Sequence, residues 1–199
     1  MLSTLDSRQA TRGSATFAKV ALSTSTKTVA ATELAYRFVE TPIGAIAIVM
    51  SERGLRRVCW SESQAAVKKD LARECPAAKE DATLAPTLVD ELRRYLAGEA
   101  VKFSVRLDPD SGSDLQRDIW QACRQVGYGK TASYGDLAER VGRPGAARAV
   151  GTAMARNPFP LIVPCHRIVR SDGGLGGYSG PSGVARKKRL LEMEAAGSR

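Results

Sequence analysis

Three short apolar stretches follow one another between residues 34 and 60, and each has the length of a β-strand. They read LAYRFVE, IGAIAIVM and LRRVCW, and the turn-forming pairs Thr41-Pro42 and Arg53-Gly54 separate them. Apolar runs of about four to eight residues bounded by turn residues are typical of strands. The pattern therefore predicts a small sheet near the start of the patterned part of the chain.

Two helices are predicted after these strands, because apolar residues recur one helical turn apart. Val67 and Leu71 define the first pattern, and Leu88, Leu92 and Leu96 define the second. This spacing places each set on one face of a helix, where it can cover the sheet. The segment as a whole is expected to form a sheet with helices.

Composition divides the chain into three predicted parts. Twelve of residues 1–33 are Ser or Thr and follow no hydrophobic period, which is typical of a disordered or flexible arm. Residues 101–113 read as a strand-like piece followed by a turn-rich linker, and a domain boundary is expected there. We therefore predict an N-terminal α/β domain over residues 34–108 and a C-terminal domain over residues 109–199.

The C-terminal part is predicted to be mostly helical. Ser113 with Gln116, and Ser133 with Asp136, match the signature of a capped helix start. Cys123 lies on the apolar face of the first of these helices, so we expect a core thiol there. The second helix is followed, across a glycine-containing turn, by an Ala-rich helix from residue 145 to about residue 156. Two short helices joined in this way match the helix-turn-helix pattern.

The Ala-rich helix has two interpretations at this stage. Its small residues, among them Ala147 and Gly151, permit a close approach of the backbone to a DNA duplex, and they equally permit close packing in a core. Arg148 is the charged residue inside this helix. It is either a solvated side chain or a group that reaches into DNA.

The chain carries a net charge of +9, and the excess is concentrated in its second half. Residues 1–100 hold 14 Lys and Arg against 12 Asp and Glu, hence +2, whereas residues 101–199 hold 16 against 9, hence +7. A basic half is typical of a protein with a polyanionic partner, most often nucleic acid, although a basic solvated surface explains it equally well. No apolar run approaches the roughly 18 residues of a membrane helix, so we expect no membrane association.

The cysteines and the single histidine exclude the usual local metal motifs. Cys59, Cys75, Cys123 and Cys165 are widely and irregularly spaced, and His166 is the only histidine. These spacings fit neither a zinc motif nor a disulfide framework. We therefore predict no metal, no cofactor and a reducing compartment, with some of the thiols buried and one a candidate for reactivity.

The stretch LIVPCHRIVR places Cys165 directly before His166. A thiolate is a nucleophile, and a neighbouring base can activate it. Consecutive residues of an extended strand point to opposite sides, so the pair needs a bend or a bridging water. A carboxylate should orient the imidazole, and Glu192 and Glu194 are the downstream candidates. From the pair alone, an inert buried thiol, a thiol hydrolase and a group acceptor all remain open.

The sequence around this pair resembles the O6-alkylguanine-DNA alkyltransferases. The segments IWQAC, ASYGDLA, AARAVG, NPFPLIVPCHRIV and GGYSG carry the resemblance, and YRFVETPIGAIAIVMSERGL resembles the N-terminal domain of that family more weakly. Together they cover about residues 34–196. The resemblance implies an α+β fold, in which a small N-terminal sheet-plus-helices domain of RNase H-like type precedes a mostly helical domain with a helix-turn-helix.

The resemblance also implies a role for each residue of the site. Cys165 would be the nucleophile, His166 its base through a water, and Glu194 the group that orients His166. Tyr134 would donate to the guanine, and Arg148 would fill the gap left by a flipped nucleotide. Asn157 would link the recognition helix to the active-site strand. The remaining residues would line the base pocket (Pro160, Tyr178 and Ser179) or contact DNA (Ser133, Ala147 and Gly151).

The implied function is DNA repair by irreversible transfer of the alkyl group of O6-alkylguanine to Cys165 after base flipping, with O4-alkylthymine as a further candidate substrate. Each molecule would react once. The expected partner is double-stranded DNA, bound by a monomer in the cytoplasm of a prokaryote or the nucleus of a eukaryote. The structural zinc of some family members is not expected, because His166 is the only histidine. A lesion-binding protein without transfer is the alternative.

Overall fold

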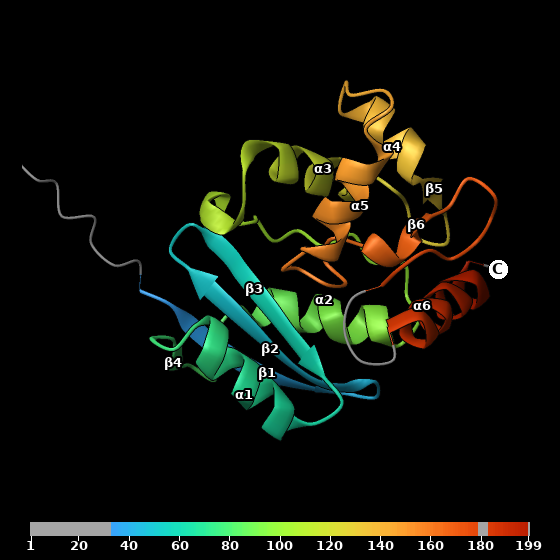
Figure 1. Cartoon of the computed structure of the whole chain (residues 1–199). Helices are drawn as coiled ribbons and strands as arrows, with labels where there is room; N and C mark the ends of the chain where they lie inside the picture. The colour runs from blue at the N-terminus through green and yellow to red at the C-terminus, as the bar shows by residue number, and fades with distance from the viewer. Residues whose placement is uncertain (1–32, 179–182, 199) are drawn as a thin grey trace, which may run out of the picture. The chain divides into compact units, whose positions relative to one another are not determined.

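The structure is a computed structural model that describes residues 33–178 and 183–198 (Figure 1). Residues Thr32–Arg199 form one compact unit. The predicted arm lies outside the described residues except for Glu33, and so does Ser179 of the predicted pocket. No helix in the described part of the chain is long and apolar enough to cross a membrane.

The predicted sheet is present, and its three main strands lie within one residue of the predicted stretches at each end. Strands β1 (Ala35–Thr41), β2 (Gly44–Ser51) and β3 (Gly54–Ser61) form an antiparallel meander. A short strand β4 (Lys79–Glu80) adds in parallel to β1, so that the strand order is β3-β2-β1-β4. Gly44 and Gly54 begin β2 and β3 with positive φ angles, which glycine adopts without strain.

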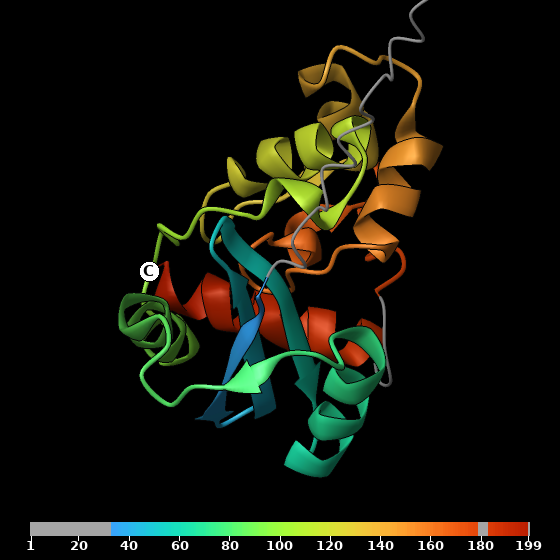
Figure 2. The ribbon, with the colours of Figure 1, turned by 90° about the vertical axis from the view of Figure 1, so that its left-hand side faces the viewer.

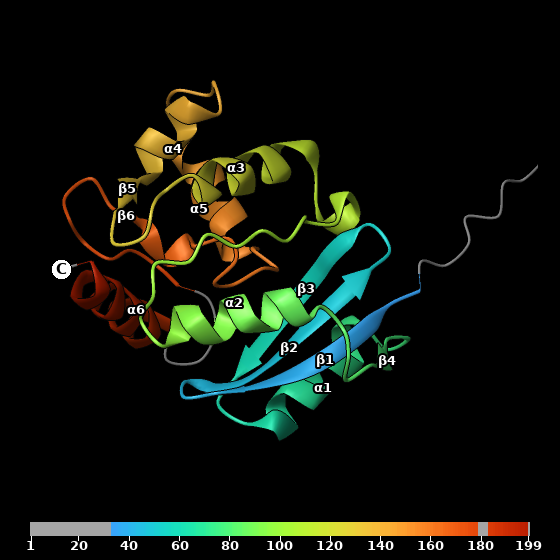
Figure 3. The same ribbon diagram turned by 180° about the vertical axis from the view of Figure 1, so that it is seen from behind.

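Both faces of the sheet are buried, each under one of the two predicted helices. Residues 46–49 of β2 alternate between two apolar clusters, as the twofold period of a strand requires. One cluster includes the buried residues of α1 (Gln64–Glu74), and the other includes those of α2 (Pro86–Leu96). Figures 2 and 3 show these helices on opposite sides of the sheet. The second cluster extends into the C-terminal helices.

The strand expected at the start of residues 101–113 is not formed. Only Leu107 makes a β-bridge, an isolated one with Leu55, within the described residues. The carbonyl groups of Phe103 and Val105 instead accept hydrogen bonds from the guanidinium of Arg124, at 2.8 and 3.0 Å. A side chain thus satisfies backbone groups that a neighbouring strand would otherwise have paired.

The two capped helices of the C-terminal part are confirmed. Helix α3 (Asp114–Arg124) begins with a capping box at Ser113, and α4 (Tyr134–Arg140) begins with one at Ser133. In each box the serine hydroxyl accepts from a backbone amide while the acidic or amide side chain accepts from the serine amide. Cys123 on α3 is fully buried in the core, as expected.

The Ala-rich helix α5 (Ala147–Ala155) packs against α4 as the second helix of the helix-turn-helix. It begins two residues later than the sequence indicated. Gly145 has a φ angle of 82°, which is outside the right-handed helical region, and Ala146 forms the N-cap. The turn therefore uses the glycine that the pattern had assigned to the helix.

The C-terminal helix α6 (Gly183–Gly197) contains a run of four basic residues, 186–189. A basic run usually forms a solvated face, but Lys187 within it is fully buried. Lys187, Leu190 and Glu194 share one helical face, and all three are buried. Two charged side chains of α6 are therefore inside the protein, where they need specific partners.

Candidate active site

An irregular segment carries Cys165, not the strand that the sequence analysis assumed. Residues 158–164 form turns without strand pairing, and Leu161 within them has a φ angle of 73°, which L-residues rarely adopt. Cys165–Arg167 then form a single 3-10 turn, η2. This turn supplies the bend that a neighbouring Cys and His require if both are to serve one site.

A two-strand pairing brings α4 to this turn. Strand β5 (Ala132–Ser133) pairs in parallel with β6 (Ile168–Val169), which directly follows η2. Tyr134, the first residue of α4, is thereby held beside the turn. Tyr134 and Cys165 line one cavity.

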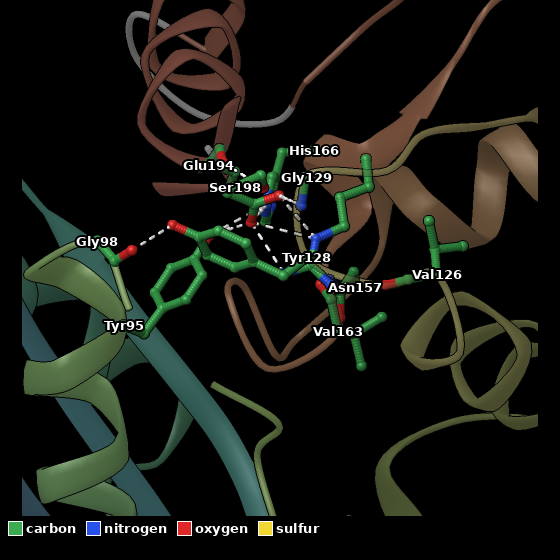
Figure 4. Close-up of polar contacts among 11 residues, drawn as sticks. Tyr95, Gly98, Val126, Tyr128, Gly129, Asn157, Val163, His166, Glu194 and Ser198 are labelled. Atoms are coloured by element: carbon green, nitrogen blue, oxygen red, sulfur yellow. Dashed lines mark hydrogen bonds and ion pairs between the residues drawn. The ribbon is translucent and has the colours of Figure 1, made fainter. Parts of the chain in front are cut away.

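Asn157 fixes the cysteine from the end of α5. Its side-chain amide donates to the carbonyl of Val163 at 3.0 Å (Figure 4) and to Sγ of Cys165 at 3.2 Å, while its oxygen accepts from the amide of Phe159 at 2.9 Å. The predicted link between the recognition helix and the active-site segment is therefore present. The segment it reaches is a turn.

Cys165 is a protonated thiol at rest. The residue is only 8% exposed, and burial raises the pKa of its thiol above the usual value. The hydrogen bond from Asn157 and the charge of Lys187 act in the opposite direction and favour the thiolate. A sulfur in this environment needs a base before it can react, and donors are already in place to stabilise the anion.

His166 is a buried, neutral imidazole with one nitrogen held and one left over. Nε2 lies 2.8 Å from Oε1 of Glu194, and a carboxylate only accepts, so Nε2 carries the proton. Burial lowers the pKa of His166 and outweighs the opposing effect of Glu194. Nδ1 is buried without a hydrogen-bond partner in the described part of the chain. Its lone pair is therefore available as a base.

Glu194 is held by two side chains and one backbone amide, which come from three parts of the chain. The guanidinium of Arg167 donates to both of its oxygens at 2.9 to 3.1 Å, the hydroxyl of Tyr95 donates at 2.6 Å, and the amide of Gly129 donates at 3.1 Å (Figure 4). Burial alone would raise the pKa of Glu194. The hydrogen bonds from His166 and Arg167 outweigh it and hold this pKa at about 2. The carboxylate is thus ionised at any physiological pH.

Sequence reasoning missed three residues of this network. Tyr95 comes from α2 and approaches His166 Nε2 at 3.1 Å as well as Glu194. Arg167 follows the Cys-His pair directly but was given no role. Lys187 donates to the carbonyl of Ile168 and lies 6.0 Å from the ring centroid of Tyr134. Of these three, only Lys187 has a clear sequence signal, because its spacing from Glu194 places both residues on one helical face.

Two cavities meet at Cys165. The larger one, of about 360 Å³, is lined by Tyr134, by Gly151 on α5 and by Tyr178. The smaller one, of about 160 Å³, also has Cys165 and Tyr178 in its wall and includes Pro160. The predicted pocket residues Pro160 and Tyr178 therefore lie at the cysteine.

The predicted DNA-contacting residues lie on the helix pair. Arg148 on α5 is exposed, whereas Ala147 and Gly151 are partly exposed. Ser133 is the N-cap of α4 and accepts from the amide of Asp136. The exposed side of α5 thus offers a cation among small side chains, and Gly151 also reaches the cavity at Cys165.

No metal site accompanies this arrangement among the described residues, where no three or more His, Cys, Asp or Glu side chains gather as metal ligands would. All four cysteines are free thiols and all are buried. The chemical groups that the structure gathers around Cys165 are an imidazole, a carboxylate and phenol hydroxyls.

Comparison with known proteins agrees with this geometry. Residues 34–109 match the ribonuclease-like domain of 6-O-methylguanine DNA methyltransferase, and residues 114–196 match the DNA-binding domain of the same protein. A methylated-DNA–protein-cysteine methyltransferase of Mycolicibacterium paratuberculosis is 39% identical over 159 residues, which are 80% of this chain and 91% of that protein. The chain belongs to the methylated-DNA–protein-cysteine methyltransferase family.

Other members of the family match part or most of the chain. The Mycobacterium bovis methyltransferase is 50% identical over 106 residues, which are 53% of this chain and 62% of that protein. The alignment thus spans less than two thirds of this relative. The crystal structure of Mycobacterium tuberculosis OGT in complex with DNA superposes with a TM-score of 0.70 and 38% identity, covering 81% of this chain and 93% of that chain. The predicted family and the predicted α+β fold are confirmed.

Proposed function

We propose that this methyltransferase-family protein repairs O6-alkylguanine in duplex DNA by moving the alkyl group to Sγ of its own Cys165. The observation that carries the proposal is the unpartnered Nδ1 of His166, the residue that directly follows the buried Cys165, with the opposite nitrogen hydrogen-bonded to Glu194. This is the arrangement of a nucleophile, a base and an orienting carboxylate. The family membership supports the same reaction.

The reaction requires one displacement and two proton transfers, one from the thiol and one to the departing guanine. His166 removes the proton of Cys165 through Nδ1 or a water bound to it, and Glu194 stabilises the imidazolium that forms. The thiolate attacks the alkyl carbon, so that a C–S bond forms while the C–O6 bond breaks. Guanine leaves with the electron pair and takes up one proton, which balances the proton lost by the thiol. A thioether is not hydrolysed by these groups, so each molecule reacts once.

Tyr134 and Lys187 are suited to the charges that develop. Burial, together with the nearby Cys165, raises the pKa of the Tyr134 hydroxyl, which stays protonated and can donate to the departing guanine. Lys187 is near enough to Cys165 for its charge to favour the thiolate. We assign Tyr134 the role of donor to the base and Lys187 that of electrostatic support.

The base must leave the duplex to reach a buried thiol. Extrusion of a nucleotide costs a few kcal/mol, which contacts to the DNA must offset. We propose that α5 lies against the duplex through Ala147 and Gly151, that Ser133 contacts the backbone, and that Arg148 fills the gap. We propose that the base then occupies the cavity of about 360 Å³ that Gly151, Cys165 and Tyr178 line. The family resemblance adds two further contacts, Pro160 in the adjoining smaller cavity and Ser179, which lies outside the described residues.

We also propose that the active unit is a monomer that works where the DNA is, in the cytoplasm of a prokaryote or the nucleus of a eukaryote. Every residue assigned to the reaction comes from one chain. The predicted division at residues 108 and 109 would give the N-terminal part a scaffold role. O4-alkylthymine is a further candidate substrate of the same pocket.

Stoichiometry under excess substrate tests this function. A duplex with one O6-methylguanine is incubated at increasing molar excess, and restored guanine is quantified after digestion. The expected yield reaches a plateau at one guanine per protein molecule. Binding without any restored guanine would favour the lesion-binding alternative, and a yield that keeps rising would indicate a turnover enzyme such as a hydrolase.

A further inference from the structure

A tryptophan from the N-terminal sheet forms part of the wall around Cys165. Trp60 lies near the end of β3, and its indole NH donates to the carbonyl of Ile43 at 3.2 Å. Its side chain lines the cavity of about 160 Å³ that contains Cys165. The orientation of the ring is therefore fixed by the β1–β2 turn.

Arg186 of α6 covers the face of this indole. Its guanidinium carbon lies 4.2 Å from the ring centroid, which is the distance of a stacked cation–π pair. Among residues 33–178 and 183–198, no carboxylate forms an ion pair with Arg186. Arg186 lines the same small cavity as Cys165. The indole is thus its partner in the described structure.

A second cavity, of about 580 Å³, adjoins the same pair. Trp60 and Arg186 belong to its wall as well, and most of its remaining lining is apolar or aliphatic, including Ile43, Leu96 and Leu190. Cys165 does not line it. The two cavities therefore share the Trp60–Arg186 pair as a common wall.

We propose that Trp60 and Arg186 form a partition that limits the size of the alkyl group Cys165 can accept. This inference rests on the proposed alkyl transfer and names its substrate range: small O6-alkyl groups fit beside the sulfur, whereas bulky ones meet the stacked pair. The base occupies the cavity at α5, and we place the alkyl group in the smaller cavity at Cys165, whose wall includes the Trp60–Arg186 pair.

Removal of either member opens a route to the larger cavity. A methyl group needs no space beyond the cavity at Cys165. A benzyl group is flat and apolar, so it gains by extending into an apolar space, and one or two methylene-sized contacts already change a rate by about tenfold or more. The size limit should therefore relax when the indole or the guanidinium is truncated.

The experiment compares the free bases O6-methylguanine and O6-benzylguanine, so that DNA contacts play no part. Second-order rate constants are measured for the wild type, Trp60→Ala and Arg186→Ala, and the benzyl-to-methyl ratio is normalised to that of the wild type. This normalisation cancels the intrinsic reactivity of the two alkyl groups. We expect the ratio to rise about tenfold or more in Trp60→Ala and less, but in the same direction, in Arg186→Ala.

Arg189→Ala is the matched control, because Arg189 is an exposed residue of α6 that lines the larger cavity only. Its ratio should stay within about twofold of the wild type. Arg186→Ala leaves the apolar core intact, so it decides the question if Trp60→Ala fails to fold. An unchanged ratio in Arg186→Ala and in any folded Trp60 variant, or an equal rise in Arg189→Ala, would overturn the partition. A wild type that transfers neither group, and no methyl from duplex DNA, would overturn the proposed function and the partition with it.

Discussion

One carboxylate organises the site at the residue scale. Glu194 accepts from His166, Arg167, Tyr95 and the amide of Gly129. A buried carboxylate with that many donors stays ionised, and it orients the imidazole whose free nitrogen faces no other partner. The reactivity of Cys165 therefore depends on side chains that never touch the sulfur.

Tyr95 is expected to act as a positioning residue through Glu194. In Tyr95→Phe the carboxylate loses its shortest donor, and a hydrogen bond to a charged group is worth about 1.5–3 kcal/mol. We expect the alkyl-transfer rate at neutral pH to fall about tenfold. The deficit should shrink as the pH rises toward the pKa of the thiol, because a thiolate no longer needs a base.

The measurement is the rate with a free alkylated base across the neutral to alkaline range. Tyr128→Phe is a suitable control, since the Tyr128 hydroxyl donates to the carbonyl of Gly98 and not to Glu194 or His166. A Tyr95→Phe deficit of the same size at every pH would indicate a structural role only.

The residues that we propose to react were visible in the sequence, but the side chains that support them were not. The Cys165-His166 pair was visible as a local motif, and the family resemblance favoured Glu194 over Glu192. The structure agrees with that choice, since Glu192 is exposed and pairs with Lys188. Tyr95 lies 71 positions from His166 along the chain, so no local pattern could bring them together.

At the scale of elements, different residues of the helix pair α4 and α5 are expected to serve DNA binding and alkyl transfer. Arg148 is exposed on α5, and in the described structure its side chain has no hydrogen bond or ion pair with Cys165, His166 or Glu194. Arg148→Ala should reduce repair of duplex DNA by about tenfold or more while leaving the reaction with a free base nearly unchanged, because only the duplex requires extrusion. Rates on the two substrates are compared in the same preparation.

Lys69→Ala removes one exposed charge from α1 and serves as the control for the change in net charge. It should affect both substrates little. Equal losses on duplex and free base in Arg148→Ala would remove Arg148 from the flipping step.

Helix α6 is expected to contribute electrostatically through Lys187. In Lys187→Met the volume is largely kept but the cation near Cys165 is lost, so the pKa of the thiol should rise further. We expect the neutral-pH rate to fall about tenfold and the pH profile of transfer to move to higher pH. The neighbouring exposed Lys188→Met is the control, and a profile that stays in place would rule out the electrostatic role.

Elements with a clear period were predictable, and those without one were not. The strands β1 to β3 and the capped helices α3 and α4 follow directly from alternation, helical spacing and capping residues. The piece before Leu107 looked like a strand, yet its carbonyls pair with Arg124. The turn at Leu161 has a positive φ at a residue that is not glycine, so nothing in the sequence marks it.

At the scale of the whole molecule, the N-terminal sheet and helices belong to the active site. Tyr95 of α2 reaches Glu194, and Trp60 of β3 lines the cavity at Cys165. The two parts that the family models match separately therefore build one centre. Because this centre is buried, the free energy of unfolding also depends on the ionisation state of Glu194.

The acid stability of the protein is expected to depend on Glu194. Its pKa is 4.5 when unperturbed and about 2 in the folded state. A depressed pKa contributes stability above pH 4.5, and this contribution is lost as the pH falls from 4.5 toward 2. The free energy of unfolding of the wild type should therefore exceed that of Glu194→Gln most above this window, and the gap should narrow within it.

Urea unfolding of both proteins at several pH values measures this gap. Glu192→Gln, an exposed neighbour on the same helix, should show no such narrowing. A gap between the wild type and Glu194→Gln that stays constant through the window would contradict the assigned ionisation.

The central claim is that Sγ of Cys165 is the alkyl acceptor, and mass spectrometry after incubation with O6-methylguanine duplex DNA tests it most directly. The account predicts that the intact protein gains one methyl group in place of one hydrogen, that the modified peptide contains Cys165, and that Cys165→Ala gains nothing. A methyl group found on Cys59, Cys75 or Cys123, or retained in Cys165→Ala, would contradict it.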